Sequence, residues 1–150
     1  MEYIKQIANN NILWAGLVSW FIAQFLKVLI TLVYTHKLDF TKLFAAGGMP
    51  SSHSSFVVTL SVSIGQLYGY DDVLFAIAAV FSFIVMYDAA NVRLEAGKQA
   101  AVINQIIAVL EDPNLNPEER LKEILGHTPL QVLAGGILGI LVALAFFGAK

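Results

Sequence analysis

Long apolar stretches alternate with short polar connections along this chain. Four of the stretches are apolar enough to be membrane-spanning helices, near residues 12–34, 53–68, 73–87 and 129–147. A helix rises 1.5 Å per residue, so about 20 residues cross a hydrocarbon core of about 30 Å. The second stretch is rather short and rich in serine and glycine, which favours close packing against neighbouring helices. The pattern predicts an all-α membrane bundle of about four spanning helices, forming a single domain over residues 1–150.

The region between the third and fourth spans has a different pattern. Apolar side chains recur at helical spacing over residues 88–112, which predicts a helix that continues out of the membrane. Pro113 to Pro117 breaks this pattern, and the charged residues 118–125 predict a second, short helix. The two segments are expected to form a peripheral helical hairpin.

The last span begins with a recognisable helix start. Thr128 is expected as the N-cap, Pro129 as the first helical residue and Gln131 as the partner that completes a capping box. Gly135 and Gly139 follow, four residues apart, and predict a small-residue face for close helix contact.

Composition places the chain among integral membrane proteins. Hydrophobic residues make up 57% of the chain and charged residues 13%, and the mean hydropathy is +0.70. These values are typical of membrane proteins rather than soluble ones. The net charge of -2, without a basic stripe, argues against nucleic acid as a partner. The absence of cysteine excludes disulfides and thiolate metal sites.

Four spans would place both long connections, residues 36–52 and 88–127, on the same side of the bilayer. That side would carry most of the basic residues, namely Lys37, Lys42, Arg93, Lys98, Arg120 and Lys122, with Lys5 and Lys150 on the other. Basic residues concentrate in cytoplasmic connections. We therefore expect a multi-pass protein of the cell membrane with these connections on the cytoplasmic side.

The connection before the second span is the most informative part of the chain. It places glycines, a proline, serines and a histidine where a loop turns into an apolar helix: Gly47, Gly48, Pro50, Ser51, Ser52 and His53. The glycines let the chain bend, and one of the two serines is expected to cap the helix. Free N–H groups at a helix start bind anions, and a histidine beside them can move protons near neutral pH. This pattern indicates phosphate chemistry at a membrane edge; a capped helix with a surface histidine is the alternative.

The same side of the predicted bundle gathers further polar residues. They are His53, Asp88, Arg93, Lys98 and His127. Lys27 lies inside the first span, about two turns below, and can reach this side by snorkelling. Basic side chains, two histidines and two helix N-termini would together form a cage for an oxyanion.

Simpler explanations exist for these residues. Lys27 could pair with Asp88 or reach lipid headgroups, although an ionisable group inside a span is functional by default. Arg93 and Lys98 are five residues apart and share a helix face poorly, so one of them could be a solvated charge. His127 could be an ordinary loop histidine.

Five short motifs follow one another over almost the whole chain. They are Gly48–Ser54 (GMPSSHS), Met86–Ala89 (MYDA), Val92-Arg93, Ala96–Ala100 (AGKQA) and Gly126–Pro129 (GHTP). Together they resemble the divergent PAP2 family. This family of small bacterial and plant membrane proteins is grouped with acid phosphatases and vanadium-dependent haloperoxidases.

The resemblance implies a phosphohistidine mechanism that needs neither a metal nor another cofactor. In the wider superfamily one histidine attacks phosphorus, and a second, in a Pro-Ser-Gly-His motif, protonates the leaving oxygen. Pro50-Ser51-Ser52-His53 is similar to that motif, which implies His53 as general acid and His127 as nucleophile. Lys and Arg side chains there hold the phosphoryl oxygens. The implied phosphate-binding residues are Lys27, Ser51, Ser52, Arg93 and Lys98, with Asp88 and Gln131 as supporting residues.

Several positions depart from the patterns of the superfamily and of its divergent branch. Its nucleophile motif has an arginine that would fall at Leu121, and the divergent family usually has a second arginine where this chain has Leu94. A carboxylate usually follows the nucleophilic histidine, where this chain has Gln131. A carboxylate would orient His127 and stabilise its charged form, whereas an amide orients it without supplying charge. Gln131 could also serve only the capping box.

Three functions are compatible with these residues. The first is a membrane phosphatase for lipid-linked phosphate monoesters or diphosphates, favoured by the pair of histidines. The second is a non-catalytic membrane protein that binds anionic lipid headgroups, favoured by Gln131 and Leu121. The third is a small channel or transporter subunit, in which glycine-rich spans would pack into a homo-oligomer.

Overall fold

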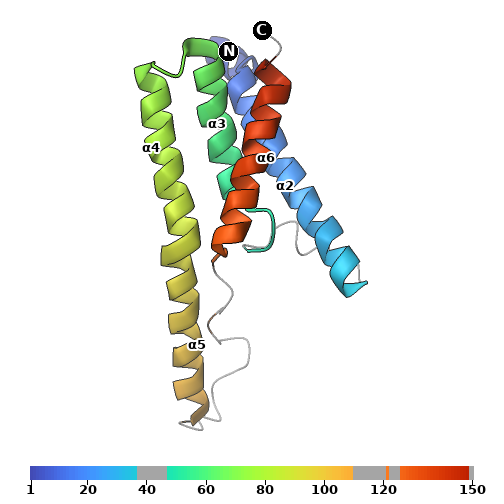
Figure 1. Cartoon of the computed structure of the whole chain (residues 1–150), viewed down its shortest axis with the longest axis vertical. Helices are drawn as coiled ribbons and strands as arrows, with labels where there is room; N and C mark the ends of the chain where they lie inside the picture. The colour runs from blue at the N-terminus through green and yellow to red at the C-terminus, as the bar shows by residue number, and fades with distance from the viewer. Residues whose placement is uncertain (37–46, 110–120, 122–125, 149–150) are drawn as a thin grey trace.

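The computed structural model describes residues 1–36, 47–109, 121 and 126–148. All regular structure in these residues is helical (Figure 1). The elements are α1 (Glu2–Ala8), α2 (Asn11–Thr35), α3 (Ser52–Tyr68), α4 (Val73–Tyr87), a π-helical turn η2 (Asp88–Val92), α5 (Arg93–Val109) and α6 (Pro129–Phe147). The prediction of an all-α chain is confirmed for the described residues.

Among the described residues, three helical stretches are long and apolar enough to cross a membrane. They are Asn11–Thr35, Val73–Ala108 and Pro129–Phe147. The remaining bundle helix, α3, has 17 residues, which rise only about 26 Å, less than a hydrocarbon core of about 30 Å. The structure therefore has three candidate spans around a shorter central helix, and the predicted count of about four spans is not confirmed.

The helix starts follow the sequence closely. Ser51 is the N-cap of α3, and its side chain accepts from the Ser54 N–H at 3.4 Å. Thr128 and Gln131 form the predicted capping box at the start of α6. Gly47 and Gly48 have φ angles of 97° and 88°, a conformation that glycine adopts without strain. These local predictions are confirmed.

α4, η2 and α5 form one continuous long helix (Figure 1). The predicted helix beyond residue 88 is thus confirmed as far as Val109. Its predicted end at residue 112 and the break at Pro113 to Pro117 lie outside the described residues. So does the predicted helix over 118–125, apart from Leu121, which has no regular secondary structure. The π-turn was not predicted, because the apolar spacing on either side of it is ordinary helical spacing.

α3 lies at the centre of the bundle and packs against α2, α4 and α6. Small hydroxyl side chains join it to each neighbour. The Ser19 and Ser55 hydroxyls share a hydrogen bond between α2 and α3, and Ser61 and Ser82 share one of 2.6 Å between α3 and α4. Thr59 donates to the Gly139 carbonyl of α6 at 3.1 Å. Such contacts suit a membrane, where lipid tails are as apolar as leucine and burial alone holds helices together weakly.

The outside of the bundle is strongly apolar. Large exposed side chains include Phe21, Val33, Val73, Phe83 and Leu130. An exposed apolar surface of this extent marks contact with lipid.

The small-residue face predicted on α6 is confirmed. A Cβ atom at Gly135 would lie 2.3 Å from the Ser51 carbonyl oxygen, and one at Gly139 would lie 2.6 Å from that of Ser55. Because neither distance leaves room for a methyl group, α6 approaches the backbone of α3 directly at both positions.

We expect Gly135→Ala to lower the free energy of unfolding by about 1–3 kcal/mol, because the added methyl group forces α6 away from α3. Gly136→Ala is the matched control, since its Cβ would lie 3.6 Å from the nearest atom, the Met86 Cε. Thermal unfolding in detergent, followed by circular dichroism, measures both. Equal melting temperatures for the two variants would contradict the close packing at Gly135.

Candidate functional site

The structure brings the two predicted catalytic histidines together. His53 lies in the first turn of α3, and His127 lies two residues before α6. Their ring centroids are 6.2 Å apart, with an angle of 66° between the ring planes. His127 is 2% exposed, whereas His53 is exposed. The clustering expected from topology is therefore present for this pair.

The π-turn holds the main chain of His127. Within η2 the Arg93 N–H donates to the Asp88 carbonyl, rather than to the Ala89 carbonyl four residues back, as it would in an α-helix. The Ala89 carbonyl instead accepts from the His127 N–H at 3.0 Å. Sequence reasoning missed Ala89, and the only available signal was its place in the MYDA motif.

Gly126 lets His127 reach the long helix. A Cβ atom at Gly126 would lie 2.4 Å from the Leu94 nitrogen and 2.6 Å from its Cα. The chain therefore crosses the backbone of α5 in direct contact, just before the histidine. The glycine of the GHTP motif has this role, which sequence reasoning also missed.

Gln131 holds the ring of His127. Its Oε1 accepts from the Thr128 N–H at 3.1 Å and lies 3.2 Å from His127 Nδ1. A backbone N–H can only donate, so this amide atom is the oxygen, and Nδ1 must carry the hydrogen of the neutral ring. In this tautomer Nε2 carries the lone pair. The capping role and the histidine-orienting role of Gln131 are thus combined in one atom.

Burial is the main cause that lowers the pKa of His127. The positive charges of Lys27 and of a protonated His53 act in the same direction, whereas the hydrogen bonds that the ring donates to Gln131 and to the Gly48 backbone oppose it. The ring therefore stays neutral at pH values where an ordinary histidine is already protonated. With Nδ1 protonated, the neutral ring is the form with a lone pair on Nε2.

Lys27 is a buried cation beside the start of α3. Its side chain is 4% exposed, and Nζ donates to the Ser52 Oγ at 3.3 Å. The backbone of Gly48 lies over its aliphatic part, since a Cβ there would be 3.7 Å from Lys27 Cγ and Cδ. The alternative pairing of Lys27 with Asp88 is not observed, because Asp88 pairs with Arg93.

The two serines of the motif make different contacts. The Ser51 hydroxyl accepts from the Ser54 hydroxyl at 3.1 Å, and the Ser51 N–H donates to the Gln131 carbonyl at 2.9 Å. Ser51 therefore ties the start of α3 to α6. Ser52 is 3% exposed and contacts Lys27.

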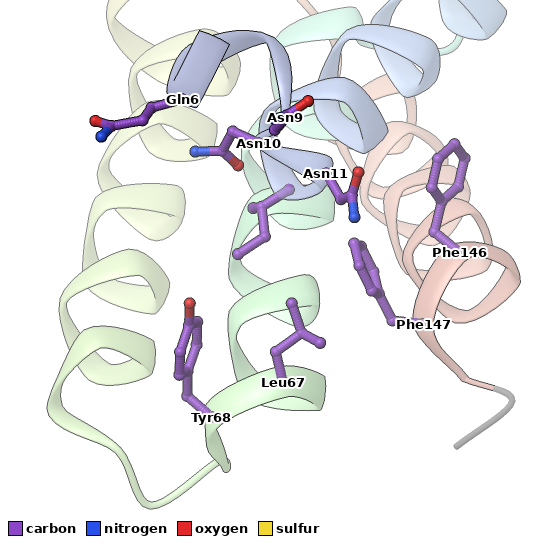
Figure 2. A pocket seen from close by; sticks show the side chains of 9 residues that line it. Gln6, Asn9, Asn10, Asn11, Leu67, Tyr68, Phe146 and Phe147 are labelled. Atoms are coloured by element: carbon purple, nitrogen blue, oxygen red, sulfur yellow. The ribbon is translucent and has the colours of Figure 1, made fainter. Parts of the chain in front are cut away.

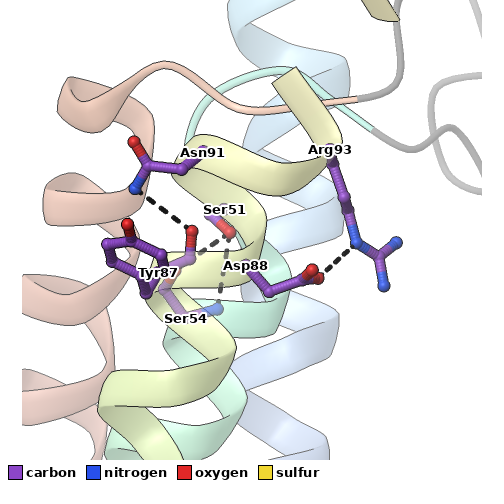
Figure 3. A network of polar contacts seen from close by, with 6 residues as sticks. All are labelled: Ser51, Ser54, Tyr87, Asp88, Asn91 and Arg93. Atoms are coloured by element: carbon purple, nitrogen blue, oxygen red, sulfur yellow. Dashed lines mark hydrogen bonds and ion pairs between the residues drawn. The ribbon is translucent and has the colours of Figure 1, made fainter. Parts of the chain in front are cut away.

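Arg93 and Asp88 form an ion pair, with Nε and Oδ2 2.7 Å apart (Figure 3). Residues five apart do not face each other on an α-helix, but the π-turn brings them side by side. The side chains are 48% and 41% exposed, and such pairs contribute only about 0–1 kcal/mol. Both charges act on the His53 ring. Arg93 can therefore exchange Asp88 for an incoming anion at little cost.

Comparisons with known proteins identify the family of this chain. The model of the divergent PAP2 family matches residues 8–142. The chain belongs to the divergent PAP2 family. It is also 39% identical to the "Uncharacterized membrane protein YuiD" of Bacillus subtilis (strain 168), over 93% of this chain and 95% of the relative. No solved structure matches the chain. The resemblance drawn from the five motifs is confirmed.

Lys98 does not join the two histidines in this member of the divergent PAP2 family. It pairs with Glu95 at 2.6 Å, and both side chains are more than half exposed on α5. Among the contacts of the described residues, none brings Lys98 to either histidine ring. Its expected role in phosphate binding stays a prediction.

Leu121, at the position of the superfamily arginine, is anchored to α5. Its N–H donates to the Asn104 Oδ1 at 3.0 Å, and its carbonyl accepts from Asn104 Nδ2 at 2.8 Å. Sequence reasoning did not single out Asn104. Of the basic side chains in the described residues, Lys27 and Arg93 are those whose charges act on the histidines.

An apolar groove of about 370 Å³ opens beside His53, between α2, α3 and α4. Its lining is Leu17, Trp20, Ser52, His53, Phe56, Val57 and Val85. A larger cavity of about 510 Å³ lies at the opposite end of the bundle, against the residues that join α1 and α2 (Figure 2). None of the predicted site residues lines that larger cavity.

Proposed function

We propose that this protein is a membrane-embedded phosphatase that hydrolyses lipid-linked phosphate esters or diphosphates through a phosphohistidine on His127. One observation carries the proposal: a buried imidazole, whose Nδ1 is bonded to Gln131 so that Nε2 carries the lone pair of the neutral ring, lies 6.2 Å from a second imidazole. A buried lysine and the N-termini of α3 and α6 lie at the same end of the bundle.

The first half of the reaction forms the phosphohistidine. His127 Nε2 attacks phosphorus, the bond from phosphorus to the leaving oxygen breaks, and protonated His53 gives its proton to that oxygen. Lys27 and Arg93 balance the charge on the other phosphoryl oxygens. Gln131 accepts from Nδ1–H throughout and keeps the ring aligned.

The second half releases phosphate. The neutral His53 takes a proton from a water molecule, which attacks phosphorus and breaks its bond to His127 Nε2. Free phosphate leaves, and both histidines return to their starting states. The concentration of basic residues in the connections places this site on the cytoplasmic side of the cell membrane in our proposal.

A non-catalytic protein that binds anionic lipid headgroups is the second candidate. The same cations and helix N-termini would bind a headgroup, and Gln131 in place of a carboxylate favours this function. The channel or transporter hypothesis relied on glycine-rich spans that pack between subunits. Gly135 and Gly139 are instead buried against α3 of the same chain.

The variant Gln131→Glu tests the orienting role of this side chain. A carboxylate beside Nδ1–H stabilises the positive ring. At pH values above the acid limb of the pH–rate profile, the rate of phosphate release should therefore rise by on the order of tenfold. In the parent protein this acid limb should lie below the ordinary histidine range, because burial lowers the pKa of His127. The variant should move this acid limb to higher pH, since the carboxylate raises the pKa of His127.

Phosphate release from several lipid phosphates, measured across pH with the purified protein, separates the candidates. Glutamate and glutamine both serve at this position of a capping box, so a purely capping Gln131 would leave the rate and the pH limb unchanged. Absence of release from both parent and variant would favour the binding protein.

A further inference from the structure

We infer that the apolar groove between α2, α3 and α4 holds one hydrocarbon chain of the substrate, which reaches it sideways from the bilayer. The inference rests on the proposed function and narrows it. The substrate class becomes amphiphilic phosphates in which a hydrocarbon chain is attached next to the phosphate.

The lining of the groove fits a hydrocarbon chain. Five of its seven lining residues are apolar: Leu17, Trp20, Phe56, Val57 and Val85. The other two, Ser52 and His53, belong to the first turn of α3. The volume of about 370 Å³ falls in the usual range for small-ligand sites, roughly 300–1,000 Å³.

The groove continues into the proposed phosphate site. Ser52 lines the groove and is also the residue to which buried Lys27 donates. His53 lines it and lies 6.2 Å from the His127 ring. The apolar groove and the cationic site thus meet at two adjacent residues, Ser52 and His53. This arrangement is complementary to a molecule with an anionic phosphate at one end and a hydrocarbon chain at the other.

The surrounding packing limits how far the groove runs along α3. On the other side of α3, Gly135 and Gly139 bring α6 into contact with the backbone of α3. Past the groove, Gly16 of α2 meets Phe56 and Leu60, with a Cβ there only 3.1 Å from each side chain. From His53 to Val57 the groove follows α3 for about 6 Å. It therefore holds the part of the chain next to the phosphate, and the remainder stays in the bilayer.

The groove contributes alignment of the substrate rather than free energy from burial of the chain. A hydrocarbon chain leaves one apolar environment for another when it moves from the bilayer into the groove, so it gains little from burial. What the groove provides is alignment of the phosphate with His127 and His53, and misplacement by 1 Å can cost about 10²-fold in rate.

Fluorescence of Trp20 tests binding without any need for hydrolysis. The chain has two tryptophans, and Trp14 lies outside the groove, with its indole N–H bonded to the Ala8 carbonyl. Trp14→Phe therefore leaves Trp20 as the single reporter. The probe is an alkyl phosphate brominated near the phosphate, added to the full chain in phosphatidylcholine nanodiscs.

We expect saturable quenching that the unbrominated alkyl phosphate reverses and the matching alcohol does not. On the same background Val85→Phe should weaken the apparent affinity at least fivefold, because the ring fills the groove. Ile84→Phe, on an exposed neighbouring position of α4, should change it less than twofold. Quenching that rises without saturation, or that the brominated alcohol reproduces, would mean that the probe quenches Trp20 from the surrounding bilayer. That result would overturn the inference.

Hydrolysis provides a second readout that separates this inference from the proposed function. The parent should release phosphate from monoacyl glycerol phosphate at least tenfold faster than from phenyl phosphate, which has no hydrocarbon chain. Val85→Phe should reduce the first rate about tenfold and leave release from phenyl phosphate within twofold. Equal rates on both compounds in parent and variant would overturn the groove. No release from any compound, together with saturable quenching, would overturn the phosphatase and leave the groove standing.

Discussion

His127→Ala is expected to reduce phosphate release to the background rate, and His53→Ala should reduce it by roughly 10²–10⁴-fold. His127 supplies the atom that bonds to phosphorus, and no other side chain in the proposed mechanism can replace it. His53 only moves protons, so water can partly substitute for it. Release of inorganic phosphate from monoacyl glycerol phosphate, with purified protein in detergent, measures both rates.

His36 provides the control for these histidines. It is the third histidine of the chain and ends α2 with a φ of 53°, a conformation that asparagine tolerates. His36→Asn should leave the rate within twofold. Trapping of labelled phosphate on the parent and on His53→Ala, but not on His127→Ala, would identify the attacking residue. Full activity of His127→Ala would rule out the phosphohistidine on this residue.

Lys27→Met is expected to lower kcat/KM by about 10²–10³-fold, without loss of stability. Lys27 is 4% exposed and its bonded partner is a neutral hydroxyl. Removing one positive group from the transition state of phosphoryl transfer has a cost of this size. Methionine keeps the length of the side chain and removes a buried charge, a change that is often neutral or stabilising.

If Lys27 serves only to stabilise the fold, the opposite result is expected. In that case Lys27→Met would lower the melting temperature, and the protein that remains folded would keep its specific activity. Lys5→Met is the matched control, because Lys5 lies in α1 and lines neither cavity. Kinetics and thermal unfolding of the three proteins, carried out in the same detergent, distinguish the two roles.

Features set by neighbouring residues were predictable from the sequence. The N-cap at Ser51, the capping box of Thr128 and Gln131, and the bends at Gly47 and Gly48 each depend on side chains within a few residues. The meeting of His53 and His127 followed from counting apolar stretches, because an even number of crossings returns the chain to the same side.

Features set by distant contacts were not predictable. The Ala89 carbonyl can accept from His127 only because the Arg93 N–H donates to Asp88 in the π-turn. His127 is far from Ala89 in the sequence. The pairing of Arg93 with Asp88 depends on the same turn, since α-helical spacing argues against it. The apolar groove needs three helices in their final places. No local pattern of residues encodes such arrangements.

The π-turn also sets the rotational phase of the long helix. Each residue of an α-helix turns the chain by about 100° around the axis. Deleting a single residue within 88–92 would let α4 and α5 join as one regular α-helix, with all of α5 turned by about that angle. The helix would then reclaim the Ala89 carbonyl, and Gly126 would face a different side of α5. One additional residue in the long helix thus decides whether the Ala89 carbonyl can accept from the His127 N–H. The number of residues between α4 and α5 is therefore as strict a requirement as any side chain of the site.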